Sequence, residues 1–156
     1  MNLRVISNQE KKAYPTSGLT AAEAVAAAKE IAPKLAERAA FAEKIRRIPD
    51  ETIFDLTESG LLRLMQPKRF GGSEQGLGVL MDVVIEIAKG CPSTAWVYSN
   101  LASHSWNIGQ FELAAQEDVW KDDPKAVAAT GLAFPCGKAT PCKGGYKVSG
   151  KWPFAS

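Results

Sequence analysis

The only histidine of the chain, His104, belongs to a set of polar residues that recur at helical spacing. Ser93, Asn100, His104 and Asn107 follow one another at separations of seven, four and three residues, which places them along one side of a helix. An imidazole titrates near neutral pH, so it can act as a general base or accept a hydrogen bond from a substrate hydroxyl. Taken alone, a helical histidine more often only hydrogen-bonds to a carbonyl group. The spacing therefore indicates a polar site but does not define its chemistry.

Three further residues have side chains that suit an aromatic substrate. Trp96 and Trp106 lie on the same predicted helix as His104 and can form the walls of a pocket for a flat ring, although tryptophans at helical spacing are more often core residues. Thr130 can add a hydroxyl group to the same pocket, but a β-branched residue in a strand needs no such role.

Composition and cysteine spacing exclude several classes of function. The 19 basic and 17 acidic residues are dispersed, which argues against a nucleic-acid interface. No stretch reaches the roughly 18 apolar residues of a membrane span, and the first residues lack a signal core, so a cytoplasmic protein is expected. Cys91, Cys136 and Cys142 form no C-x-x-C pair. We therefore predict neither a disulfide framework nor a metal site, and we expect Cys136 to be inert.

Helices are expected to position these residues. Thr20 and Glu23 form a capping-box pattern, and apolar residues then recur at helical spacing to residue 47. Pro33 lies inside this stretch and predicts either a kink or the start of a second helix. Further helices are predicted at residues 50–60, 77–89, 93–108 and 112–120. The helix at 77–89 is expected to bury Leu80, Val83, Val84 and Ile87.

The pattern changes from helical to β near residue 125. Residues 126–130, 146–149 and 152–154 each predict a strand, separated by turns rich in glycine and proline. Two or three strands cannot bury both faces of a sheet, so we expect further strands after Ser156. The sequence thus predicts an α+β chain with a loose lead-in at 1–18, a helical domain at 19–123 and the truncated start of a β domain at 124–156.

The order of these pieces resembles the acyl-CoA dehydrogenase superfamily. Residues 60–72, which read GLLRLMQPKRFGG, match a motif of its helical domain, and the loop at 133–139 and the strand at 150–156 match segments that face the flavin. The resemblance covers nearly the whole chain. It implies an all-helical N-terminal domain of acyl-CoA dehydrogenase type, followed by the first strands of an incomplete β-barrel domain, in a protein that forms a homotetramer when full length.

Within the superfamily, the chain resembles the branch of two-component flavin-dependent monooxygenases, such as the oxygenase components that act on 4-hydroxyphenylacetate. The dehydrogenases usually carry Thr-Glu-Pro-Gly-x-Gly-Ser-Asp in the first flavin loop, whereas residues 133–140 here read AFPCGKAT. The acidic and serine positions are absent. The stretch STAWV at 93–97 and the histidine on the same helix also resemble the monooxygenase branch.

This branch implies a reaction and two catalytic residues. Reduced flavin, either FMN or FAD, comes from a separate NAD(P)H flavin reductase and reacts with O2 to give a C4a-hydroperoxyflavin, which hydroxylates a small aromatic, phenolic substrate. His104 would contact the substrate hydroxyl, and Ser156 would lie beside the flavin N5 atom.

The resemblance also implies binding residues around these two. The resemblance places the backbone of Phe134, Pro135, Cys136 and Gly137 near the flavin pyrimidine ring, and Gly137 permits close approach. Ser156 is placed at the flavin as well. Around the substrate it places Trp96, Asn100, His104 and Thr130.

Two other functions remain open from the residues. An acyl-CoA dehydrogenase would remove hydrogens from a thioester with a carboxylate base, which in that family lies beyond the part that resembles this chain. A non-catalytic truncated remnant, or a helical interaction module, would present exposed apolar faces on its helices and its unfinished sheet.

Overall fold

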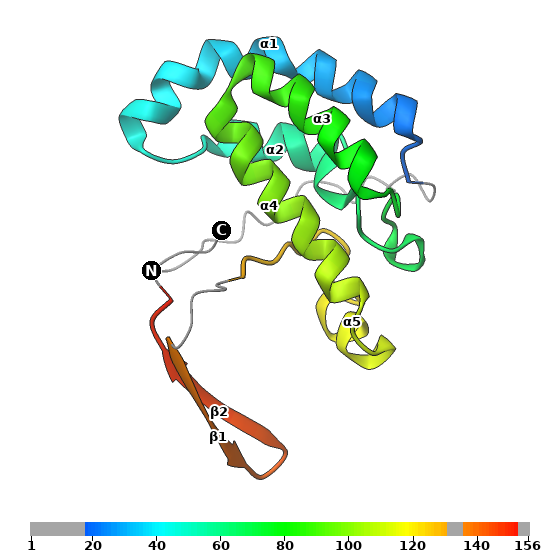
Figure 1. The fold of residues 1–156 in the computed structure, drawn as a ribbon, viewed down its shortest axis with the longest axis vertical. Helices are drawn as coiled ribbons and strands as arrows, with labels where there is room; N and C mark the ends of the chain where they lie inside the picture. The colour runs from blue at the N-terminus through cyan, green and yellow to red at the C-terminus, as the bar shows by residue number, and fades with distance from the viewer. Residues whose placement is uncertain (1–17, 131–135, 153–156) are drawn as a thin grey trace.

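The computed structural model of the chain describes residues 18–130 and 136–152. Its elements are α1 (Ala21–Ile45), α2 (Asp50–Glu58), the 3-10 turns η1 (Leu61–Arg63) and η2 (Lys68–Phe70), α3 (Leu77–Gly90), α4 (Pro92–Gly109), α5 (Leu113–Trp120), β1 (Gly137–Cys142) and β2 (Gly145–Gly150). The helices form one body, and the two strands project away from it as a hairpin (Figure 1). The expected α+β class is confirmed. None of the helices in the described ranges is long and apolar enough to cross a membrane.

The first helix begins at the predicted capping box. The Thr20 side chain accepts a hydrogen bond from the Glu23 amide at 3.3 Å, and the Glu23 carboxylate accepts one from the Thr20 amide at 2.8 Å. The helix then continues through Pro33, so of the two predicted alternatives the start of a second helix is wrong. Pro33 is exposed, and water can therefore hydrate the carbonyl group that it leaves without an amide donor.

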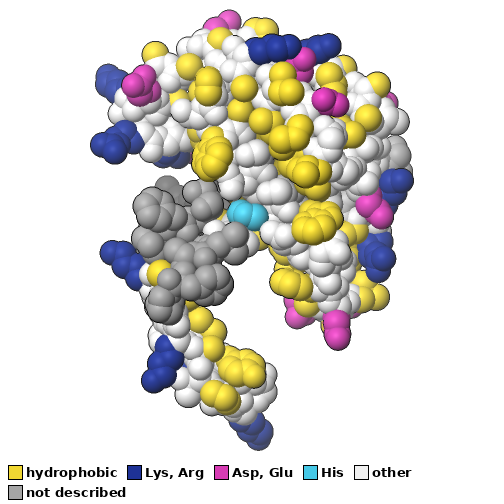
Figure 2. Space-filling model, in the orientation of Figure 1, with side chains coloured by type: hydrophobic (Ala, Val, Ile, Leu, Met, Phe, Trp, Pro, Cys, Tyr) yellow, Lys and Arg dark blue, Asp and Glu magenta, His cyan; other side chains and the backbone are white. Residues whose placement is uncertain are grey.

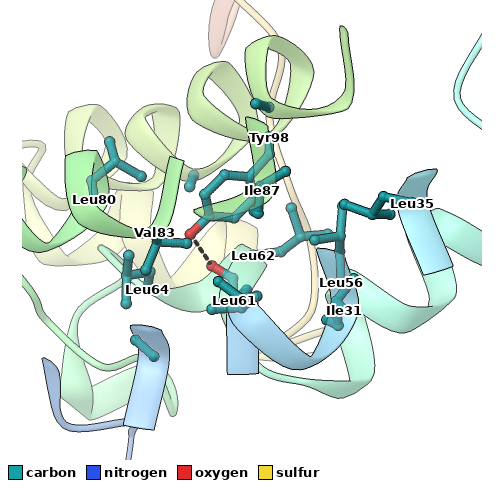
Figure 3. Close-up of a cluster of buried hydrophobic side chains, with 14 of the residues drawn as sticks. Ile31, Leu35, Leu56, Leu61, Leu62, Leu64, Leu80, Val83, Ile87 and Tyr98 are labelled. Carbon is teal, nitrogen blue, oxygen red and sulfur yellow. Dashed lines mark hydrogen bonds between the residues drawn. The ribbon is translucent and has the colours of Figure 1, made fainter. Parts of the chain in front are cut away.

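The hydrophobic core lies where α1, α3 and α4 cross (Figure 3). The predicted burial of Leu80, Val83 and Ile87 is confirmed, whereas Val84 is only partly buried. The helices α1 and α3 pack backbone against backbone at one point, since a Cβ atom on Gly90 would lie 2.1 Å from the Ala32 carbonyl oxygen. The apolar periodicity of the sequence therefore identifies the faces that meet in this core.

Tyr98 is the largest polar side chain of this core. Its hydroxyl donates a hydrogen bond to the Leu61 carbonyl at 3.2 Å, drawn as a dashed line in Figure 3, and the same carbonyl accepts the Leu64 amide. Burial raises the pKa of Tyr98 well above its usual value. A group whose pKa is raised by folding contributes stability below its unfolded pKa and loses that contribution as the pH rises past it.

We expect Tyr98→Phe to destabilise the fold near neutral pH and to protect it in alkali. At pH 7 the variant should lose roughly 0.5–1.5 kcal/mol, because the Leu61 carbonyl loses one of its two donors. Above a pH of about 10, where an unfolded tyrosine ionises, the wild type should lose stability faster than the variant. Urea unfolding at pH 7 and above about pH 10 measures the difference in unfolding free energy between the wild type and the variant, with the exposed Tyr146→Phe as control. A difference that stays constant into alkali would contradict the raised pKa of Tyr98.

The hairpin differs from the prediction in one strand. β1 and β2 are antiparallel, from Gly137 paired with Gly150 to Cys142 paired with Gly145. The strand predicted at 146–149 is confirmed, but residues 137–140, expected in a loop, form part of β1. A two-residue turn explains the difference, because Gly144 has a φ of 84° and this left-handed conformation folds the preceding residues back onto β2.

Candidate functional site

His104 lies on the flank of α4, under the segment that follows α5. Pro92 at the start of α4 suits a first helical turn, and the helix continues to Gly109. His104 is 6% exposed, and part of it is visible on the face shown in Figure 2, where it is the cyan side chain. The predicted polar side of α4 is thus divided: Ser93 and Asn107 are exposed, whereas His104 is buried.

Both imidazole nitrogens of His104 have hydrogen-bond partners. Nδ1 lies 3.0 Å from the Ala128 carbonyl oxygen, and Nε2 lies 3.0 Å from the Thr130 hydroxyl. A carbonyl oxygen can only accept, so these partners assign the proton to Nδ1. In the neutral ring, Nε2 then keeps its lone pair and accepts the Thr130 hydroxyl. The structure therefore presents a basic nitrogen that already faces a hydroxyl group.

Residues 124–130, here called the covering segment, place Ala128 and Thr130 against the imidazole. Every second carbonyl of this segment accepts from a side chain of the helical body. The pairs are Gln66 Nε2 to Pro124 at 3.0 Å, Trp120 Nε1 to Ala126 at 3.1 Å and His104 Nδ1 to Ala128. The strand predicted at 126–130 is therefore wrong, because side chains, and not a neighbouring strand, take these carbonyl groups.

The motif at 60–72 contacts the covering segment through Gln66. Gln66 also donates to the Phe70 carbonyl at 2.8 Å, and the Phe70 ring packs against Trp120 with centroids 5.3 Å apart. A Cβ atom on Gly72 would lie 2.0 Å from the Gln66 carbonyl oxygen, so only glycine fits beside Gln66. The paired glycines form a tight turn, in which Gly71 has a φ of 81°. No sequence pattern indicates a role for Gln66, which lies 58 residues from Pro124, or for Trp120, which lies 6 residues from Ala126.

Among the described residues, no side-chain hydrogen bond joins His104 to the other predicted substrate residues on α4. The Asn100 amide donates to the Trp96 carbonyl of its own helix at 2.8 Å. Trp96 is 63% exposed and lines a hollow of about 940 Å³ between the end of α1 and the start of α4. It lies two helical turns from His104, about 12 Å along the axis. Trp106 lines a separate hollow of about 670 Å³ with Ser103 and Asn107.

The described part of the predicted flavin site can be tested for its fit to a planar ring. Phe134, Pro135 and Ser156 lie outside the described residues. Gly137 begins β1 opposite Gly150, and a Cβ atom on either would meet the Trp152 indole, at 2.3 Å and 3.0 Å respectively. The two glycines therefore form a flat surface that accepts an aromatic ring. The Trp152 indole occupies that surface here, so the contact of Cys136 and Gly137 with a flavin stays a prediction. No cluster of metal ligands occurs among the residues that the structure describes.

Comparison with known proteins gives a consistent set of similarities. The family model of the acyl-CoA dehydrogenase N-terminal domain matches residues 18–120. The p-hydroxyphenylacetate 3-hydroxylase oxygenase component of Acinetobacter baumannii is 39% identical over 127 residues, which cover 81% of this chain and 30% of that protein. The flavin-dependent monooxygenase oxygenase subunit HsaA of Rhodococcus jostii is 40% identical over 124 residues, covering 80% of this chain and 32% of that protein.

Solved structures show the same similarity. The 3-HSA hydroxylase from Rhodococcus sp. RHA1 aligns with a TM-score of 0.81 and 37% identity over 86% of this chain and 34% of that one. XiaF from Streptomyces sp., in complex with FADH2 and glycerol, aligns with a TM-score of 0.82 and 32% identity over the same shares. The predicted resemblance to the monooxygenase branch is confirmed. The chain spans about a third of the length of these relatives.

Proposed function

The chain belongs to the acyl-CoA dehydrogenase family, and on that premise we propose that it is the N-terminal part of the oxygenase component of a flavin-dependent monooxygenase. The proposed reaction is hydroxylation of a small phenol, with O2 and reduced flavin, FMN or FAD, as co-substrates. The observation that carries the proposal is the His104–Thr130 pair, in which a basic nitrogen faces a hydroxyl group at 3.0 Å. The similarity to oxygenase components of aromatic hydroxylases supports it.

The proposed role of His104 is to act on the substrate hydroxyl. A phenol whose oxygen replaces or joins the Thr130 hydroxyl at Nε2 can give its proton to that nitrogen. Loss of the proton increases the electron density of the ring, which favours attack on an electrophilic oxygen. The Ala128 carbonyl, hydrogen-bonded to Nδ1–H, stabilises the imidazolium that forms. Bound reduced flavin supplies the electrons that activate O2.

The remaining site residues and partners belong to the same proposal. Phe134, Pro135, Cys136, Gly137 and Ser156 are proposed to lie at the flavin. Trp96 and Asn100 are proposed to lie farther along the substrate side, Asn100 one helical turn and Trp96 two helical turns before His104 on α4. We assign residues 19–123 to the helical domain, 1–18 to its lead-in and 124–156 to the start of a β domain. A separate NAD(P)H flavin reductase, a homotetramer and a cytoplasmic location complete the proposal.

The proposal is tested by supplying chemically reduced flavin and oxygen to the complete enzyme with a panel of simple phenols. We expect a hydroxylated product, and we expect acyl-CoA thioesters to leave oxidised flavin unreduced. Substrates of the relatives, p-hydroxyphenylacetate and resorcinol, belong in the panel. Reduction of the flavin by a thioester, without phenol hydroxylation, would instead identify a dehydrogenase.

The Thr130 hydroxyl offers a more specific prediction. We expect Thr130→Val to lower the yield of hydroxylated product per oxygen consumed by up to about tenfold, because Nε2 loses a hydrogen-bond partner and the substrate loses a polar neighbour. Thr130→Ser keeps the hydroxyl and should retain most of the coupling. Product and hydrogen peroxide, measured together, give the ratio. Loss of coupling in Thr130→Ser but not in Thr130→Val would show that the methyl group of Thr130 matters, and not its hydroxyl.

A further inference from the structure

We infer that Trp120 and Gln66 are positioning residues that set the register of the covering segment and thereby hold the proton of His104 on Nδ1. The inference rests on the proposed function only for its catalytic consequence. Its structural content is a series of three side-chain donors on the carbonyls of Pro124, Ala126 and Ala128.

The chemistry of the donors fixes the direction of these bonds. An indole N–H can only donate, and the Gln66 amide nitrogen lies near two carbonyl oxygens, so it donates to both. Residues 123–126 form a turn in which the Ala126 amide donates to the Asp123 carbonyl at 3.0 Å, and the segment after this turn places Ala126 and Ala128 on their two donors. A shift of the segment by one residue would bring a different backbone group to each donor. Such a shift would take the Ala128 carbonyl away from the imidazole. The two upstream bonds therefore determine which group His104 meets.

Both side chains are buried, and the buried polar atoms of Gln66 indicate that its role is to donate hydrogen bonds. Trp120 is 1% exposed and Gln66 is 0% exposed. Within the described residues, the Gln66 Oε1 atom is buried without a hydrogen-bond partner. An apolar side chain of similar size would avoid that cost, so the two donated bonds are what glutamine adds at this position. The Lys125–Glu58 ion pair also touches the segment, but it is partly exposed and contributes little to the register.

The consequence for His104 is a choice of tautomer. Free histidine in water favours the form with its proton on Nε2, and that form could not accept a proton from a phenol at Nε2. A correctly placed Ala128 carbonyl reverses the preference, because it accepts a hydrogen bond only from Nδ1–H. Trp120 and Gln66 thus act on the reaction through His104 and do not need to touch the substrate.

Nitrogen NMR of the imidazole in this chain tests the inference directly, because the chain has one histidine. Its two ring nitrogens are told apart by their couplings to the protons on Cδ2 and Cε1. In the neutral ring of the wild type, we expect Nδ1 to have a protonated, pyrrole-like shift and Nε2 an unprotonated, pyridine-like shift. In Trp120→Phe, which keeps an aromatic ring against Phe70 but removes the N–H, both shifts should move toward the average of the two tautomers. Trp106→Phe changes a half-exposed tryptophan of α4 and should leave both shifts unchanged.

Gln66→Met provides an independent variant, because it removes the upstream donor and the unpartnered oxygen together. It should shift the imidazole signals in the same direction as Trp120→Phe, and it serves as the test if that variant does not fold. A wild-type proton on Nε2, or a folded variant with wild-type shifts, would overturn the inference. A wild-type enzyme that hydroxylates no phenol would contradict the proposed function and leave the NMR result intact.

Discussion

His104→Ala is expected to lower hydroxylation of a phenolic substrate by about 10²–10⁴-fold, the usual contribution of a general base. The imidazole acts on the substrate hydroxyl, whereas the oxidant comes from flavin and oxygen. Oxygen consumption should therefore continue, and hydrogen peroxide should replace the hydroxylated product. The variant also leaves the Ala128 carbonyl and the Thr130 hydroxyl without their shared partner, so their hydrogen bonds pass to water.

A matched control comes from the same helix. Asn107→Ala removes an exposed polar side chain one helical turn away from His104 and should leave hydroxylation near the wild-type rate. Product formation, oxygen uptake and peroxide release are measured for both variants under single-turnover conditions. If His104→Ala hydroxylates with unchanged coupling, His104 is a structural residue of the helix and the proposed base is wrong.

Gly90→Ala is expected to lower the free energy of unfolding by about 1–3 kcal/mol, the cost of adding a group to a filled site. The new Cβ atom would lie 2.1 Å from the Ala32 carbonyl oxygen and 2.9 Å from its carbonyl carbon. These are backbone atoms in the middle of α1, so no side-chain rotation relieves the contact. The helices α1 and α3 must separate, and the core beneath them loses contact.

Gly78→Ala is the internal control, since it is the same substitution in the same helix. A Cβ atom on Gly78 meets nothing within 4 Å, so the gain in helix propensity should stabilise the chain by roughly 0.5–1 kcal/mol. Thermal and urea unfolding of the two variants should therefore shift in opposite directions. Shifts of the same sign would show that propensity, and not the approach of α1 to α3, controls the effect at Gly90.

The helices could be predicted from the sequence because their determinants are local. The capping box at Thr20 and the spacing of Leu80, Val83 and Ile87 depend only on residues within a few turns of one another. The hairpin was predicted only in part, since strand pairing depends on a partner and on a turn. The strand expected at 126–130 failed for a related reason: the carbonyls of Ala126 and Ala128 are taken by side chains that lie 6 and 24 residues away in sequence.

The candidate site was predictable to a similar extent. His104 could be chosen because it is the only histidine and has polar neighbours at helical spacing, and the structure brings Thr130 to it as expected. The structure does not bring Trp96 to His104, because two helical turns separate them. Gln66 and Trp120 gave no signal, since a glutamine and a tryptophan become positioning groups only when the fold places carbonyls in front of them.

Hydroxylation under isotopically labelled oxygen gas, ¹⁸O₂, tests the central claim most directly. The complete enzyme is mixed with reduced flavin, labelled oxygen and a phenol, and the product is analysed by mass spectrometry. We predict that the new ring hydroxyl carries labelled oxygen in the wild type and that this labelled product is largely lost in His104→Ala. A product that takes its oxygen from water, or labelled product at equal yield in both proteins, would contradict the account.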